Sequence, residues 1–141
     1  MTKQSYIIAL LLVFFVSFSC KAQEKKYGTT NKKAIKNYEE GKSYYDIRKN
    51  DLAELSLLLA IKNDPNFAEA ELLLAYVYTE NNAPEKAIEH YQKSININPN
   101  LFPEAHASLG LLQIDMGKYT EAKKNLENYL TYTNSPLMMK P

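Results

Sequence analysis

The sequence predicts an all-α protein: three copies of a two-helix unit, arranged as a helical hairpin array behind an N-terminal export signal. The main observation is a recurring pair of stretches, "IKNDPNFAEAELLLAYVY" at 61–78 and "ININPNLFPEAHASLGLL" at 95–112. Each has an Asp or Asn, then Pro-Asn, and then an Ala-containing apolar run. Pro65 and Pro99 lie 34 residues apart. A fixed period of this size is typical of a repeat array.

The first nineteen residues differ from the rest and predict a signal peptide over 1–19. Lys3 supplies a positive charge, and an apolar run follows from Ile7 to Phe18, interrupted only by Ser17. This run has the length of a signal-peptide core and is shorter than the roughly 20 residues of a membrane span. An uncleaved N-terminal anchor is the alternative interpretation.

Cys20 is the only cysteine, so an internal disulfide is excluded. The stretch 17–20, "SFSC", resembles a bacterial lipobox, although the usual Leu three residues before the cysteine is absent. The resemblance implies that Cys20 becomes the lipidated first residue of a membrane-anchored lipoprotein in the cell envelope, with the outer membrane favoured. Cleavage after Ala22 is the alternative, and it would give a soluble periplasmic or secreted protein.

A polar linker is expected over 20–33, because "QEKKYGTTNKK" at 23–33 has no apolar periodicity. The net charge is +1 with the signal present. Loss of Lys3 would bring it to zero. This neutrality argues against nucleic acid as the main partner, since nucleic-acid binding needs a basic surface.

The repeats divide into 34–67, 68–101 and 103–136, followed by a short tail at 137–141. Apolar spacing predicts two helices in each unit, at 34–48 with 51–63, 68–81 with 84–96, and 103–116 with 119–132. Asp64-Pro65 and Asn98-Pro99 are expected to end helices, because the residue before proline is pushed out of the helical region. Asn81-Asn82 and Gly117 supply residues that tolerate positive φ where the first helix of a unit ends.

Small residues recur where the two helices of a unit must approach closely: Gly41, Ala75 and Gly110 on the first helix, and Ala53, Ala87 and Ala122 on the second. With large apolar residues such as Tyr44 and Tyr78 between them, this pattern resembles the tetratricopeptide repeat (TPR) over 34–136. The fourth position of each unit, often Trp in that family, is Asn37, Glu71 or His106 here. The resemblance implies an α-solenoid that binds a protein or peptide partner.

The family's groove positions fall on the first helix of each unit. The resemblance therefore implies a partner-binding groove lined by Tyr38, Lys42, Tyr45, Glu69, Leu72, Tyr76, Glu80, Glu104, Leu111 and Asp115. Tyrosines beside acidic residues favour a basic or amine-bearing segment. The carboxylate clamp of TPR chaperone adaptors is not expected, because its Lys, Asn and Arg positions are occupied by Tyr38, Lys42, Leu73, Glu104 and Ser108.

The sequence offers no catalytic constellation. Its four glycines do not cluster into a phosphate loop, and His90 and His106 lie on different helices without cysteine partners. We therefore expect a protein without enzymatic activity, cofactor or metal. Two further hypotheses remain: a non-catalytic accessory subunit of an envelope enzyme, and self-association through the third repeat.

Overall fold

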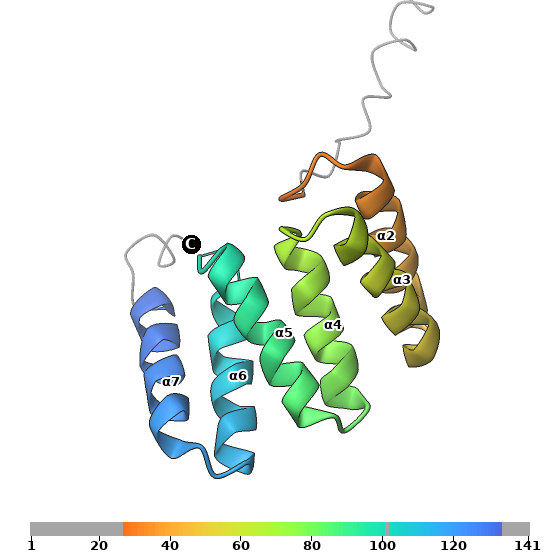
Figure 1. The fold of residues 1–141 in the computed structure, drawn as a ribbon. Coiled ribbons are helices and arrows are strands. Elements are labelled where there is room, and N and C mark those ends of the chain that lie inside the picture. The colour runs from red at the N-terminus through yellow and green to blue at the C-terminus, as the bar shows by residue number, and fades with distance from the viewer. Residues whose placement is uncertain (1–26, 101, 134–141) are drawn as a thin grey trace, which may run out of the picture.

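The computed structural model describes residues 27–100 and 102–133, and this part of the chain consists of helices, turns and loops without strands. Its helices are α2 (Lys32–Asp46), α3 (Asn50–Asn63), α4 (Ala68–Glu80), α5 (Pro84–Ile97), α6 (Pro103–Asp115) and α7 (Tyr119–Thr133). They form three hairpins that lie side by side in chain order, from α2 and α3 at the right of Figure 1 to α6 and α7 at the left. The prediction of three two-helix units is confirmed for this part of the chain. The signal peptide, Cys20 and the tail at 137–141 lie outside the described residues.

Residues 27–31 differ from the prediction of a polar tether over 20–33. The Tyr27 ring packs edge-on against Tyr38, with ring centroids 5.3 Å apart, and against Phe67 at 6.0 Å. The Gly28 N–H donates to Glu69 Oε1 over 2.8 Å. The folded body therefore includes this segment, the N-terminal arm (residues 27–31). The segment is polar overall, so its composition did not indicate that the Tyr27 ring packs against residues far along the chain.

The arm also begins the first helix. The Asn31 side chain accepts hydrogen bonds from the Lys33 and Ala34 N–H groups, which caps α2. Its Nδ2 donates to the Asn63 carbonyl, 2.7 Å away, at the end of α3. This one residue thus fixes the start of α2 and ties it to the other helix of the hairpin.

Each hairpin is held together by a close approach of its two helices. A Cβ on Gly41 would lie 2.8 Å from Leu57 Cγ, and one on Gly110 would lie 2.8 Å from Leu126 Cγ. Such a distance is shorter than van der Waals contact, so the expected role of these small residues is confirmed. The core of the described part is built from Leu57, Phe67, Leu74, Val77, Tyr91 and Leu109, all almost fully buried.

The turns and the helix ends between hairpins follow the predicted chemistry. Asp64 and Asn98, each before a proline, are extended, with φ of −147° and −149°. Ser94 Oγ donates to the Ala68 carbonyl over 2.9 Å, which joins α5 to the start of α4. Among the helices described, none is both long and apolar enough to cross a membrane.

Candidate partner-binding groove

The predicted groove residues lie on the first helix of each hairpin. Tyr38, Lys42 and Tyr45 are on α2; Glu69, Leu72, Tyr76 and Glu80 are on α4; Glu104, Leu111 and Asp115 are on α6. Residues three or four apart share a helix face, so each helix can present its set on one side. The three sets differ in how much of their side chains a partner could reach.

Two of the predicted groove residues on α4 are buried. Glu69 is only 8% exposed and Leu72 only 5%. Glu69 lies under the N-terminal arm, where it accepts the hydrogen bond from Gly28, and Leu72 belongs to the main core cluster. The structure therefore corrects the prediction that these two side chains line an accessible groove: the arm covers Glu69, and the packing of the helices buries Leu72.

Tyr38 is half-buried in the same region. Its ring lies 5.0 Å from that of Phe67, centroid to centroid, and it also contacts Tyr27. Burial, together with the charges of Glu69 and Glu39, raises the pKa of the Tyr38 phenol to about 12. This tyrosine chiefly packs the arm against the array.

Among the predicted groove residues, Glu80 is paired with polar side chains within the protein. Tyr45 Oη donates to Glu80 Oε1 over 2.8 Å, and Arg48 Nη1 lies 2.5 Å from the same oxygen. Asn50 Nδ2 donates to Glu80 Oε2 over 3.2 Å. The hydrogen bond from Tyr45, supported by Arg48 and Asn50, lowers the pKa of the Glu80 carboxyl. Burial and Glu80 raise the pKa of Tyr45 to about 12. This cluster links α4 to the turn between α2 and α3.

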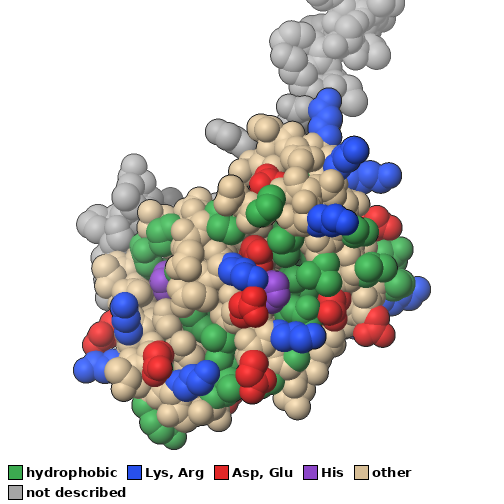
Figure 2. All heavy atoms as spheres, in the orientation of Figure 1, with side chains coloured by type: hydrophobic (Ala, Val, Ile, Leu, Met, Phe, Trp, Pro, Cys, Tyr) green, Lys and Arg blue, Asp and Glu red, His purple; other side chains and the backbone are tan. Residues whose placement is uncertain are grey.

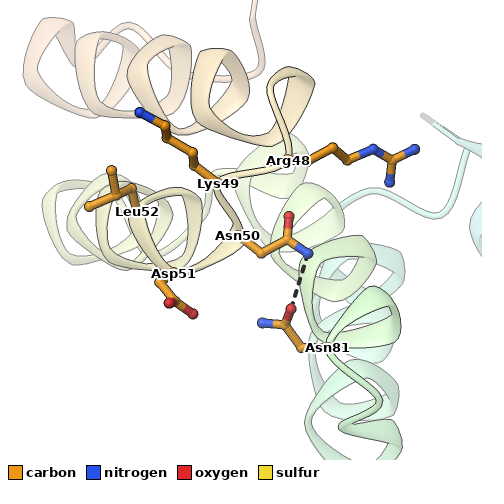
Figure 3. A pocket seen from close by; sticks show the side chains of 6 residues that line it. All are labelled: Arg48, Lys49, Asn50, Asp51, Leu52 and Asn81. Carbon is orange, nitrogen blue, oxygen red and sulfur yellow. Dashed lines mark hydrogen bonds between the residues drawn. The ribbon is translucent and has the colours of Figure 1, made fainter.

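Beside this cluster, the ends of the helices form an open hollow of about 420 Å³ lined by Arg48, Lys49, Asn50, Asp51, Leu52 and Asn81. In Figure 3 the Asn50 amide points to Asn81, and the 3.0 Å hydrogen bond between Nδ2 and Oδ1 joins the two turns. The Arg48 side chain points away from this pair. No sequence pattern indicated this hollow. No group of three or more His, Cys, Asp or Glu side chains that could hold a metal ion occurs in the described ranges.

At the other end of the array, α6 presents accessible apolar groups. Leu111 is 59% exposed and Ile114 is 39% exposed. Glu104 and Asp115 are exposed on the same helix. In the second hairpin the residue equivalent to Leu111 is Tyr76, which packs on Tyr91 with ring centroids 5.6 Å apart. Leu111 has no such cover within the described part of the chain.

The arrangement of hairpins agrees with a family comparison. The family model of "Anaphase-promoting complex, cyclosome, subunit 3" (ANAPC3) matches residues 48–129, more than half of the chain. The chain belongs to this family of TPR-type repeats. No curated protein matches the chain.

Solved structures similar to this TPR-type chain include a crystal structure of MamA, 32% identical, with a TM-score of 0.67, covering 70% of this chain and 57% of that one. The chain therefore spans less than two thirds of the MamA chain. The TPR2B domain of yeast Sti1, in a complex with pHsp70, is 26% identical with a TM-score of 0.67 and covers 72% of this chain and 80% of that one. The second TPR of Spaghetti (RPAP3), bound to the HSP90 peptide SRMEEVD, is 22% identical. Its TM-score of 0.68, over 72% of this chain and 94% of that one, shows the fold alone.

Within this TPR array, the histidines form polar pairs between the helices of a hairpin. His90 Nδ1 lies 2.5 Å from Glu71 Oε2, and both side chains are buried. His106 Nδ1 lies 3.3 Å from Asn125 Oδ1, and Asn125 Nδ2 donates to Gln113 Oε1. Glu71 and His106 occupy the position where the family often has Trp. Both histidines are buried, and their polar partners were not predicted. An observable signal existed, because both pairs have the same separation of 19 residues.

Proposed function

We propose that this TPR-type protein is an interaction module that binds a protein or peptide segment on the exposed face of α6. The observation that carries the proposal is the apolar pair Leu111 and Ile114, flanked on the same helix by the carboxylates of Glu104 and Asp115. Apolar side chains that water reaches are the natural contact area of a partner. The peptide-bound state of the Spaghetti and Sti1 domains supports this class of function by fold.

The charge of the site favours a partner with apolar and basic side chains. Two carboxylates beside an apolar pair would attract Lys or Arg and repel acidic residues. The HSP90 peptide SRMEEVD, which binds the similar Spaghetti domain, is rich in acidic residues. Glu104 also places a carboxylate at a position where the carboxylate clamp of TPR chaperone adaptors has a Lys. We therefore propose that this protein discriminates against such acidic tails.

A peptide-binding measurement tests the site. The probes are a fluorescein-labelled peptide of alternating Leu and Lys and the labelled peptide SRMEEVD. The full-length protein should bind the first and not the second. Leu111→Ser combined with Ile114→Ser should weaken binding by about tenfold, because a few central contacts dominate such interfaces. The matched control is Leu130→Ser, at a leucine on α7 that is 54% exposed. Equal binding of both peptides, or an unchanged affinity of the α6 variant, would contradict the proposal.

We further propose that the protein is an exported bacterial lipoprotein anchored through lipids on Cys20. The support is the sequence: Lys3, the apolar run that follows it, and a single cysteine where that run ends. Two or more acyl chains anchor a protein stably, whereas one binds only marginally. Six residues lie between Cys20 and Tyr27, the first described residue, so seven Cα–Cα steps connect the two. An extended chain of that length spans at most about 25 Å, so the first hairpin would lie near the bilayer.

Intact mass and membrane fractionation test the anchor. The natively expressed protein should carry acyl mass on Cys20 and sediment with membranes, and Cys20→Ser should release it. An N-terminus at Gln23 in the soluble fraction would instead support a diffusing adaptor. A non-catalytic accessory subunit is the second candidate function, and co-purification of an active envelope enzyme would favour it.

A further inference from the structure

The second helix of the first hairpin, α3, carries an exposed apolar stripe formed by Leu52, Leu55, Leu58 and Leu59. These side chains are 41%, 58%, 42% and 43% exposed. They lie three or four residues apart, so they share one face of the helix. The buried face of α3 is a different one, made of Ala53, Ser56, Leu57 and Ala60. In Figure 2 hydrophobic side chains are visible over the side of the molecule where α3 lies, with charged groups beside them.

The other two hairpins provide an internal comparison. Their second helices, α5 and α7, occupy the same place in the repeat, and the four equivalent positions there are polar. They are Lys86, Glu89, Gln92 and Lys93 on α5, and Glu121, Lys124, Glu127 and Asn128 on α7. The outer face of this helix therefore does not need leucine for the TPR fold. Four leucines on one helix form a contiguous apolar surface, which is typical of an interaction site.

The charges at the two ends of the stripe indicate which occupant fits. Asp51 lies four residues before Leu55, and Lys62 lies four residues after Leu58; both are exposed on the leucine face. If two copies of α3 pack antiparallel with Leu55 opposite Leu58, Asp51 of one copy lies opposite Lys62 of the other. A twofold axis repeats this contact, so an Asp51–Lys62 pair forms at each end of the helix pair.

From this stripe and its charges, we infer that α3 is a self-association surface, on which two copies of this chain pack antiparallel through the four leucines. An anionic bilayer is a poorer fit, because Asp51 and Glu54 lie on the same helix. The inference goes beyond the peptide-binding site on α6 and does not depend on the lipid anchor. It places self-association on the first hairpin, at the opposite end of the array from the third repeat. A single helix pair buries an area at the low end of protein interfaces, below about 1,200 Å², so the dimer is weak and concentration-dependent.

Sedimentation equilibrium over a range of protein concentrations tests the inference. The full-length chain carries Cys20→Ser, so that acyl chains on Cys20 do not cause association of the protein in micelles. The mass should rise from monomer to dimer with concentration, and Leu55→Lys should weaken dimerisation by about tenfold or more. Lys86→Glu, at the position on α5 that is equivalent to Leu52, is the matched control and should leave the mass profile unchanged. The far-ultraviolet circular dichroism of every variant is compared, so that a loss of folding is recognised.

Two pairs of variants test the antiparallel register. Asp51→Lys alone should weaken the dimer, and adding Lys62→Asp should restore it, because the swapped charges face each other again. Leu55→Lys and Leu58→Glu should each dimerise poorly alone and better when mixed. A chain that stays monomeric at all concentrations overturns the inference. Association unaffected by Leu55→Lys overturns it too and assigns the contact to another surface. Binding of wild-type protein to anionic vesicles that Leu55→Lys abolishes, without dimerisation, would assign the stripe to lipid.

Discussion

At the residue scale, the three turns inside the hairpins depend on one backbone conformation. Arg48, Asn82 and Gly117 occupy equivalent positions and have φ of 60°, 55° and 72°. Glycine adopts this left-handed region freely, asparagine tolerates it, and a long side chain such as that of arginine enters it less readily. The sequence predicted Gly117 and the pair Asn81-Asn82 from this preference, without choosing between the two asparagines. Arg48 could not be predicted, because its stabilising partner, Glu80, lies on the next hairpin.

Gly117→Ala should destabilise the protein by about 1–2 kcal/mol, the ordinary penalty for an L-residue in the left-handed conformation. No atom lies within 4 Å of the position that the new Cβ would occupy, so the loss is due to the backbone alone. Urea unfolding followed by circular dichroism measures it. Asn82→Gly is the reverse control and should raise the free energy of unfolding slightly. Equal stability of Gly117→Ala and wild type would contradict the assigned turn conformation.

At the scale of the elements, the close approach of α2 and α3 makes a second prediction. Replacing glycine by alanine in an open helix stabilises it by about 1 kcal/mol. At Gly41, however, the added Cβ would lie 2.8 Å from Leu57 Cγ and 3.3 Å from the Ala53 carbonyl oxygen. Leu57 is fully buried and cannot turn aside, and overpacking costs about 1–3 kcal/mol. Gly41→Ala should therefore lower the free energy of unfolding by about 1 kcal/mol.

Gly110→Ala is the matched comparison. Its contacts are nearly the same, with Leu126 Cγ at 2.8 Å and the Ala122 carbonyl oxygen at 3.3 Å. Leu126 is only half-buried on α7, the last helix described, and can shift. We expect a change close to zero in the same urea measurement. If Gly41→Ala instead stabilised the protein by about 1 kcal/mol, the full preference of an open helix for alanine over glycine, α2 and α3 would be packed less tightly than the structure indicates.

The elements also show where sequence reasoning succeeds. The period of the prolines and the apolar spacing predicted the six helices of the described part, because these features are local and repeated. The arm was missed because Tyr27 packs on Tyr38 and Phe67, contacts that no local pattern reveals. Glu69 was misplaced for a related reason, because the arm covers it. Leu72 was misplaced because family positions describe a helix face and do not show how deeply neighbouring helices bury each residue on it.

At the scale of the whole molecule, the hairpins are joined by tyrosines whose hydroxyl groups stay neutral. Tyr45 on α2 donates to Glu80 of α4, and Tyr78 on α4 donates to Glu54 of α3 over 2.9 Å. Burial raises the pKa of both phenols to about 12, and the neighbouring carboxylates act in the same direction. Burial also raises the pKa of Tyr91, which packs between α4 and α6. The contacts between hairpins therefore share a sensitivity to alkaline pH.

The sign of this dependence follows from the direction of the pKa shifts. An unfolded tyrosine ionises near pH 10, whereas Tyr38, Tyr45 and Tyr78 in the folded protein ionise near 12. Their stabilising contribution is therefore complete below pH 10 and is lost as the pH rises from 10 through 12. We predict that the thermal unfolding midpoint falls steeply over this range.

Two variants and a spectroscopic measurement test this prediction. Tyr119→Phe, at a tyrosine that is 68% exposed, should leave the dependence of the unfolding midpoint on pH unchanged. Tyr45→Phe should make the unfolding midpoint depend less on pH between 10 and 12. It should also lower the stability at neutral pH, because Glu80 loses a hydrogen bond. Tyrosinate absorbance recorded beside circular dichroism makes the test decisive: ionisation of all tyrosines near pH 10 with helices intact would contradict the packing of the hairpins described above.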